Sequence, residues 1–468
     1  MIGRHDETNM LLDCLESDRS HFVAVTGRRR IGKTYLVRQV LGQHFTFHAT
    51  GVAKVGQRRQ LEEFTKSLRK YGSQSTPMPT DWFAAFHTLR ELLESSPAEK
   101  KVVFLDELPW MATRRPEFIS ALESFWNGWA AWSSDVLLVV CGSATSWLVS
   151  NLFQNTGGLH NRVTRRIHLQ PFTLAECREF FETNGFAMGT TDLLEAYMVF
   201  GGVPYYLDLL DKRYSLAANI GRECFAIGGQ LRHEFDTVYT SLFQHWEGYV
   251  QVVRALATKR KGLTRSDIIK ATRIPNGGRM TKILTELEQC GFIARVRPFG
   301  RKNRGSLYQL IDFFTLFHIN FIEGSDPDPQ YWQKYGTGPA HSAWAGNSFE
   351  LVCRAHLRQL LQQLGVGAVI TTATSWRSEQ TDPGAQIDLV IERADNVINL
   401  CEMKYAPAPY LITRSLDEAM RYRRSVFVGE TGTRKAVHLT MVTPFGLVRN
   451  MYSDSLQSQV SMEPIIRG

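Results

Sequence analysis

Residues 27–34 have the residue types and spacing of a phosphate-binding loop, Gly-Arg-Arg-Arg-Ile-Gly-Lys-Thr. Gly27 and Gly32 allow the backbone to curl so that its N–H groups, with Arg30 in the same loop, meet phosphate oxygens. Lys33 is spaced to reach the β and γ oxygens, and Thr34 offers a hydroxyl to Mg²⁺. The segment therefore predicts a site for ATP and Mg²⁺.

Two acids follow an apolar run at Lys101–Leu105, as a nucleotide hydrolase requires. We expect Asp106 to hold the Mg²⁺ and Glu107 to polarise the attacking water. Ser143, at the polar end of another apolar run, is predicted to sense the γ-phosphate. An Asp-Glu pair at the end of a strand is otherwise often only solvated, but the loop upstream favours the nucleotide interpretation.

A second group of charged residues lies near the other end of the chain. Asp388 is followed by Glu402 and Lys404, and Glu350 precedes them in a helical pattern. Strand alternation puts Glu402 and Lys404 on one face, so two acids and a lysine converge. We expect Asp388 and Glu402 to bind Mg²⁺, Lys404 to activate water, and Glu350 to complete the metal shell. The alternative is an exposed salt bridge between strands.

Basic residues in the middle of the chain suit contact with nucleic acid. Arg279 and Lys282 lie at the start of a predicted helix. Arg301, Lys302 and Arg304 lie at the tip of a predicted hairpin. Cations at these places neutralise DNA phosphates. The alternative is a module that packs against other protein and leaves a solvated hairpin tip.

The elements around these residues define the expected fold. Apolar strands alternate with helical patterns in the N-terminal part, which predicts a parallel sheet with helices on both faces. Short helices from Val250 and a hairpin outline a winged helix-turn-helix, and a helix, a strand and a hairpin outline a restriction-endonuclease-like α/β domain. The predicted division is an ATPase core at 1–170, a helical lid at 171–245, a winged helix at 246–322, a linker at 323–346 and a nuclease-like domain at 347–468.

Composition narrows the class of protein. The 468 residues carry a formal net charge of +8, which favours a polyanionic partner such as DNA. Seven scattered cysteines have no paired spacing for zinc or disulfides, so reduced thiols are expected. The polar N-terminus and the lack of a long apolar run predict a cytoplasmic protein that does not enter a membrane.

Taken together, the N-terminal motifs resemble the AAA+ ATPases of the prokaryotic signal-transducing (STAND) type, often called archaeal ATPases. Gly3 and Arg4 are similar to that family's box beside the adenine, Gly142-Ser143 to its sensor strand, and Gly201–Pro204 to the start of its lid. The resemblance implies an arginine near the γ-phosphate, and Arg162 is the candidate for it. Alternatively, Arg162 belongs to a solvated basic turn without this role. It also implies either homo-oligomers that assemble on ATP binding or a monomer awaiting activation.

The C-terminal residues look like the PD-(D/E)xK nuclease signature, with Gln386-Ile387 where the founding pattern has proline before Asp388. The leading hypothesis is thus an ATPase that controls DNA binding and Mg²⁺-dependent DNA cleavage. In a second hypothesis the chain is a nucleotide switch whose nuclease-like domain is an inactive scaffold for DNA or protein. A third is a transcriptional regulator that acts through the winged helix.

Overall fold

The computed structural model describes residues 1–72, 75–112, 117–143, 145–153, 157–159, 161–259, 261–300, 305–378, 380 and 384–468. They fall into two compact units, Met1–Pro171 and Phe172–Gly468. Within the described residues, no helix has both the length and the apolar character that a membrane span needs.

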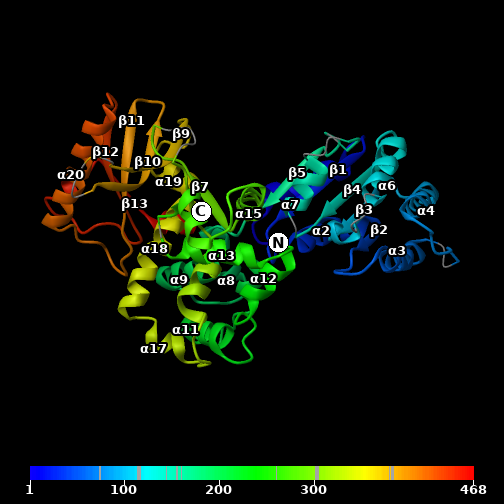
Figure 1. Ribbon diagram of the computed structural model, residues 1–468, viewed down its shortest axis with the longest axis horizontal. Helices are drawn as coiled ribbons and strands as arrows, with labels where there is room; N and C mark the ends of the chain where they lie inside the picture. Colours follow the sequence, from blue (N-terminus) through cyan, green and yellow to red (C-terminus); the bar gives the residue numbers. More distant parts are fainter. Residues whose placement is uncertain are drawn as a thin grey trace. The chain divides into compact units, whose positions relative to one another are not determined.

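Unit 1 is a parallel sheet with helices on both faces (Figure 1). The strand order is β2-β3-β4-β1-β5, and every neighbouring pair is parallel. Its elements are α1 His5–Glu16, β1 His21–Gly27, α2 Lys33–Leu41, β2 Phe45–Thr50, α3 Gln57–Tyr71, α4 Trp82–Ser95, β3 Lys101–Asp106, α5 Leu108–Met111, α6 Glu117–Phe125, β4 Val136–Cys141, α7 Thr145–Leu148 and β5 Arg165–Leu169, with a 3₁₀ turn at Gly42–His44 and π-helical turns at Trp126–Ala130 and Val149–Phe153.

Strand β1 explains why helices cover both faces of this sheet. All seven of its residues are buried, which is typical of strands in parallel sheets. Val23 and Val25 pack with α1 and α2 on one face, while Phe22 and Ala24 pack with α3, α4 and α6 on the other. The carboxyl ends of β1, β3 and β4 therefore meet at one edge, where the predicted nucleotide residues follow them.

Unit 2 contains helices, a small sheet and a larger mixed sheet. Its elements are α8 Leu174–Thr183, α9 Thr190–Phe200, α10 Pro204–Asp208, α11 Leu216–Ile220, α12 Glu234–Leu242, α13 Glu247–Ala257, β6 Leu263–Thr264, α14 Arg265–Thr272, α15 Gly278–Gln289, β7 Ile293–Val296, β8 Leu307–Leu310, α16 Phe313–Phe317, α17 Tyr331–Tyr335, α18 Pro339–Ala355, α19 Leu357–Gln363, β9 Thr371–Arg377, β10 Gln386–Arg393, β11 Val397–Met403, α20 Arg414–Thr431, β12 Ala436–Thr443, β13 Ser458–Ser461 and α21 Met462–Arg467, with π-helical turns at Gly221–Phe225 and His318–Ile322 and a 3₁₀ turn at Ser453–Ser455.

The Gly-Gly-Val-Pro segment separates α9 from α10. Gly201 and Gly202 have φ of 64° and 65°, in the left-handed region that glycine adopts at little cost. A Cβ on Gly202 would lie 2.3 Å from the carbonyl oxygen of Phe172, and the Phe172 N–H donates to the Gly202 carbonyl at 2.8 Å. Pro204 then begins α10 at a position where no N–H is needed.

Helices α13, α14 and α15 and the sheet β6-β8-β7 pack around one core. The turn before α15 is held by Arg265, whose guanidinium donates to the Asn276 side chain at 3.0 Å and to the Thr281 hydroxyl at 2.9 Å. Arg273 ends α14 with φ of 58°. The helices and the hairpin thus lie in the predicted order, and residues 301–304 of the hairpin are outside the described residues.

The segment predicted as a linker, 323–346, differs from that prediction. It contains α17 and the first half of α18, which begins at Pro339 rather than near Asn347. Trp332 and Trp344 are buried, and their ring centroids lie 5.7 Å apart in an edge-to-face arrangement. The Gly, Pro and Asp content suggests a loop, but burial of two large aromatic rings stabilises packed helices here.

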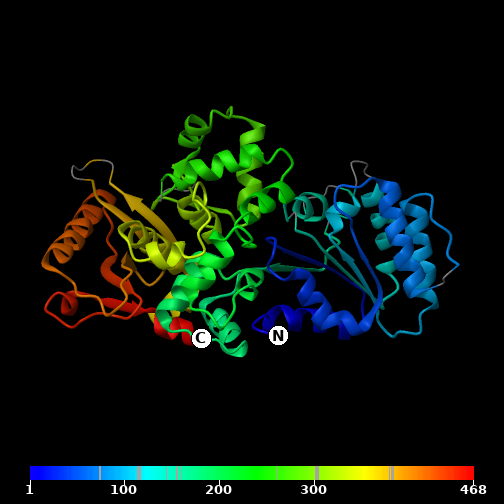
Figure 2. The ribbon, with the colours of Figure 1, turned by 90° about the horizontal axis from the view of Figure 1, so that it is seen from below.

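The C-terminal sheet has the order β13-β12-β11-β10-β9. Strands β10 and β11 form an antiparallel hairpin across the predicted turn, in which Asn396 has φ of 64°. Strands β11, β12 and β13 are mutually parallel. Helix α20 packs along this sheet (Figure 2). Its Phe427 and Met420 are buried in the core of this part. The sheet thus presents Asp388 and Glu402 on two central strands.

Candidate functional site

The loop between β1 and α2 has a tightly constrained backbone. Gly27 has φ of 139°, and a Cβ there would lie 2.6 Å from the Leu169 carbonyl oxygen. Gly32 has φ of 89° and immediately precedes α2. Arg30 also lies in the left-handed region, with φ of 71°. The loop therefore ends at a helix N-terminus, whose N–H groups suit an anion.

Lys33 is the first residue of α2, and its side chain is buried against the loop. Its Nζ donates to the carbonyl oxygens of Gly27 at 3.0 Å and Arg28 at 2.9 Å. The ammonium is therefore held inside the curl of the loop, where a lysine can neutralise phosphate charge.

Thr34 and Asp106 are brought together from two elements 72 residues apart. The Thr34 hydroxyl lies 3.0 and 3.2 Å from the two carboxylate oxygens of Asp106. Asp106 is buried, and its Oδ1 also accepts from the Glu107 N–H at 2.9 Å. A hydroxyl and a carboxylate are oxygen ligands that Mg²⁺ accepts, so the residues fit this metal.

Cys141 is a neighbour of this carboxylate that sequence reasoning missed. Its thiol donates to Oδ1 of Asp106 at 2.7 Å from the end of β4. Burial, and then the Asp106 charge, raise the pKa of the Cys141 thiol well above its ordinary value, so it stays a neutral donor. The seven cysteines are all free and buried, as expected for reduced thiols. Only the register between β3 and β4 reveals the contact.

Glu107 turns away from Asp106 and toward Ser143. It has φ of 49°, a strained value for a residue with a side chain, and it precedes α5. The Ser143 hydroxyl donates to Oε1 of Glu107 at 2.7 Å, and the Ser143 N–H donates to Oε2 at 3.3 Å. The two acids at the end of β3 are therefore separated, as their proposed roles require.

The remaining N-terminal candidates lie at the ends of α1 and β5. Gly3 and Arg4 are both in the left-handed region just before α1. The Arg4 guanidinium donates to the carbonyl oxygen of Gln170 at 2.7 Å, which ties the start of the chain to the end of β5. Arg162 is exposed before β5, and within the described part of the chain its side chain has no hydrogen bond or ion pair.

A second candidate site lies on the β10-β11 hairpin. Leu389 pairs with Cys401, so continuing the register by one residue places Asp388 opposite Glu402. The Lys404 ammonium lies 2.9 Å from Oε1 of Glu402. The three predicted side chains of this motif therefore occupy one region of the sheet.

Glu350 joins them from helix α18. Burial, and then the nearby Asp388 carboxylate, raise the pKa of Glu350 to about 7, while Lys261 and Arg354 act in the opposite direction. Glu402 raises this pKa further. The charges of Asp388 and Glu402 therefore both act on Glu350.

Four further polar side chains surround these acids, and sequence reasoning did not assign them to the site. Lys261 lies 3.1 Å from Oδ1 of Asp388, and the Gln386 amide donates to the same oxygen at 3.0 Å. Arg354 donates to the backbone carbonyl of Asp388, and Arg423 pairs with Glu402. Arg423 lies on helix α20, 21 positions after Glu402.

These cations change the interpretation of Asp388 and Glu402. Among the described residues, no group of three or more His, Cys, Asp or Glu side chains is arranged to hold a metal ion. Asp388 and Glu402 instead have cationic partners, Lys261 for Asp388 and Lys404 and Arg423 for Glu402. The donor set fits a hard divalent cation only if such a cation displaces these partners.

The basic candidates of the middle segment are partly described. Arg279 and Lys282 are both exposed on the first turns of α15. They line a pocket together with Tyr249 and Ile283. Arg301, Lys302 and Arg304 lie outside the described residues.

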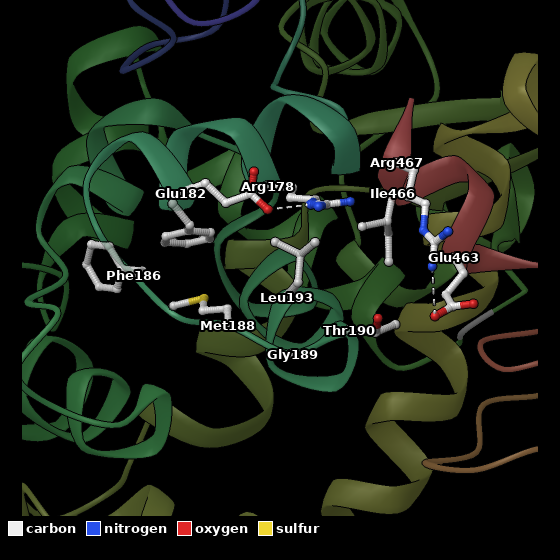
Figure 3. Close-up of a pocket in the computed structure, with 11 residues that line it drawn as sticks. Arg178, Glu182, Phe186, Met188, Gly189, Thr190, Leu193, Glu463, Ile466 and Arg467 are labelled. Carbon is white, nitrogen blue, oxygen red and sulfur yellow. Dashed lines mark hydrogen bonds and ion pairs between the residues drawn. The ribbon is translucent and has the colours of Figure 1, made fainter.

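A separate pocket lies between α8, α9 and the C-terminal helix α21 (Figure 3). Its apolar lining includes Phe186, Leu193 and Ile466. The charged groups at its rim are paired with each other, Arg178 with Glu182 at 2.6 Å and Arg467 with Glu463 at 3.7 Å. None of the predicted site residues lines it.

Comparison with known proteins finds a similarity in the N-terminal part. Residues 1–210 match a family described as an ATPase domain predominantly from Archaea, so this part of the chain is similar to such ATPase domains. The chain is 24% identical over 328 residues to an uncharacterized protein of Methanocaldococcus jannaschii, covering 69% of this chain and 68% of that protein.

Solved structures with a similar arrangement have low sequence identity. A Walker-type ATPase of Pyrococcus abyssi is 18% identical with a TM-score of 0.48, and the match covers 68% of this chain and 96% of the other. The ORC2 protein of Aeropyrum pernix, in ADPNP and ADP complexes, is 14% identical with a TM-score of 0.43, and the match covers 69% and 93% of the two chains.

Proposed function

We propose that unit 1 binds ATP with Mg²⁺ and hydrolyses it. The observation that carries this proposal is the meeting of Thr34 with Asp106 beside the constrained loop that holds Lys33. Residues from β1, α2 and β3 thus converge at one sheet edge, and the match of residues 1–210 to an ATPase domain agrees with it.

The residues of this site have separate roles in the proposed hydrolysis. The loop N–H groups and Lys33 bind and orient the phosphates, and Thr34 and Asp106 would hold Mg²⁺, which when bound neutralises phosphate charge. Glu107 orients a water molecule and accepts its proton. Ser143 holds the Glu107 carboxylate in one rotamer through the 2.7 Å hydrogen bond.

Two variants test this assignment in the full chain. Lys33→Ala is expected to lose ATP binding and hydrolysis, whereas Glu107→Gln is expected to keep binding and lose hydrolysis. Lys66→Ala, at an exposed lysine of α3, is the matched control. Phosphate release and binding of a fluorescent ATP analogue are the measurements, and normal hydrolysis by either site variant would contradict the proposal.

A second candidate function is metal-dependent cleavage of DNA by unit 2. The observation that favours it is the position of Asp388 opposite Glu402 on the β10-β11 hairpin, with the Lys404 ammonium 2.9 Å from Oε1 of Glu402. A divalent cation that displaced the cationic partners of these carboxylates would be held by their oxygens. Arg279 and Lys282, exposed on α15, would contact the DNA phosphates.

Cleavage is tested with linear, circular and single-stranded DNA, in Mg²⁺ or Mn²⁺, with and without ATP. Asp388→Asn is expected to abolish cleavage while ATP hydrolysis persists. Asp395→Asn, in the exposed β10-β11 turn where Asp395 pairs with Arg393, is the matched control. If the wild type cuts no DNA in any condition, unit 2 is instead a scaffold for DNA or protein.

A further inference from the structure

The last residue of strand β4 lies between the two strands that carry the nucleotide site. Cys141 pairs with Val25 of β1, two residues before the phosphate-binding loop begins. On the other side, Val140 pairs with Leu105 of β3. Continuing this register by one residue places Cys141 opposite Asp106. The two side chains are 1% and 4% exposed, so they are buried together at the edge of the sheet.

Cys141 and Asp106 point to the face of the sheet that helix α2 covers. Phe104, two residues before Asp106, packs in the core that contains the buried side chains of α2. Cys141 belongs to the same core. Because successive side chains of a strand alternate between its faces, Asp106 points to this face as well. Thr34 lies on the first turn of α2, where it meets the carboxylate.

The two oxygens of the Asp106 carboxylate have different partners. Oδ1 accepts from the Cys141 thiol at 2.7 Å and from the Glu107 N–H at 2.9 Å. Oδ2 lies 3.0 Å from the Thr34 hydroxyl, which is 3.2 Å from Oδ1. The thiol and the N–H therefore hold Oδ1 toward the ends of β3 and β4, which leaves Oδ2 turned toward Thr34.

We propose that Cys141 is a positioning residue of the ATP site, whose thiol fixes the rotation of the Asp106 carboxylate so that Oδ2 faces Thr34. The inference rests on the first proposed function, the binding and hydrolysis of ATP by unit 1. In that function Asp106 and Thr34 act on Mg²⁺ together with the phosphates of ATP, which supply further oxygen ligands. A carboxylate without the thiol rotates more freely and meets the ion less often.

The test measures how Mg²⁺ changes the binding of a fluorescent, non-hydrolysable ATP analogue to the full-length protein. Cys141→Val removes the donor and fills the space with an apolar side chain of similar size. It is expected to raise the Mg²⁺ concentration at half-maximal response about tenfold, the lower end of the range for groups that orient metal ligands, because a thiol is a weak donor. Binding of the analogue in EDTA is expected to stay unchanged.

Two further variants separate the hydrogen bond from packing. Cys141→Ser keeps a donor at this position and is expected to retain most of the Mg²⁺ response. Cys14→Val is the matched control, because Cys14 is a 1% exposed thiol of the same core, on α1. It is expected to leave both measurements unchanged. Thermal unfolding without nucleotide checks that each variant is folded.

The outcomes distinguish this role from the proposed function. An unchanged Mg²⁺ response in Cys141→Val overturns the positioning role and leaves ATP binding intact. Equal weakening with Mg²⁺ and in EDTA also overturns it, because the whole site would then be distorted. A shift in Cys14→Val equal to that in Cys141→Val, or no recovery in Cys141→Ser, assigns the effect to packing and overturns the role of the thiol. If the wild type does not bind the analogue, or Mg²⁺ has no effect on its binding, the proposed function and the positioning role are both wrong.

Discussion

The Ser143 hydroxyl donates a 2.7 Å hydrogen bond to Oε1 of Glu107, which joins the ends of neighbouring strands β4 and β3. Glu107 adopts a strained backbone conformation with φ of 49°. The carboxylate is thus oriented both by its own backbone and by a residue from the next strand. Such orientation is what a group that positions water requires.

Ser143→Ala is expected to lower the rate of ATP hydrolysis about tenfold with little change in ATP affinity, because a hydrogen bond to a charged group contributes about 1.5 kcal/mol or more. Steady-state phosphate release and equilibrium binding of ATP are the two measurements. Ser143→Thr keeps the hydroxyl and should retain most of the rate. A Thr variant as slow as the Ala variant would contradict this role of the hydroxyl.

Gly27→Ala is expected to destabilise unit 1 by at least about 2 kcal/mol, because the added Cβ would lie 2.6 Å from the Leu169 carbonyl at a φ of 139°. ATP binding should weaken as well, since the loop must shift. Gly42→Ala is the control, because φ there is −57° and no atom lies within 4 Å of the added Cβ. Urea unfolding compares the two, and equal stability would show that the loop accommodates the methyl group.

Phe299→Ala is expected to loosen the docking of the β7-β8 hairpin on β9, at a cost of about 1–2 kcal/mol for a half-buried ring. Hydrogen exchange should become faster at the Ser375 amide, which donates to the Arg297 carbonyl. Ile370→Ala, at a side chain 81% exposed just before β9, is the control. Unchanged exchange at Ser375 would mean that the ring does not maintain the docking.

The buried His318 is expected to make the protein less stable in mild acid. Its ring is buried and stacks on Phe235 with centroids 4.5 Å apart. Burial, and then the charges of Arg254 and Arg232, lower the pKa of His318 to about 4. The unfolded chain therefore binds a proton below about pH 6.5 that the folded chain does not bind until about pH 4.

Protonation of His318 therefore leaves the free energy of unfolding unchanged above about pH 6.5. As the pH falls toward 4, it lowers this free energy by at most about 3 kcal/mol. Thermal unfolding of the wild type and of His318→Gln between pH 7.5 and 4.5 measures it. The difference in midpoint between them should change over this range. A constant difference would show that His318 titrates alike in both states.

Local patterns predicted the elements of the nucleotide site well. Strand β1, helix α2 and strand β3 lie where apolar runs and the glycine spacing placed them, and the loop joins them in the predicted order. The prediction of a linker at 323–346 rested on the Gly and Pro content of this segment. It gave too little weight to Trp332 and Trp344, which are buried against partners elsewhere in the chain. Propensity describes the backbone locally, whereas burial depends on the tertiary structure.

The chemistry of each site follows from the order and spacing of its residues along the chain. Gly27, Lys33 and Thr34 lie in one local segment, and Lys404 directly follows the strand that carries Glu402, so residue type and period are enough to predict them. The contact of Cys141 with Asp106 and that of Lys261 with Asp388 arise only in the folded chain. Both join residues at least 35 positions apart, and their approach depends on strand order and docking, which no local pattern encodes.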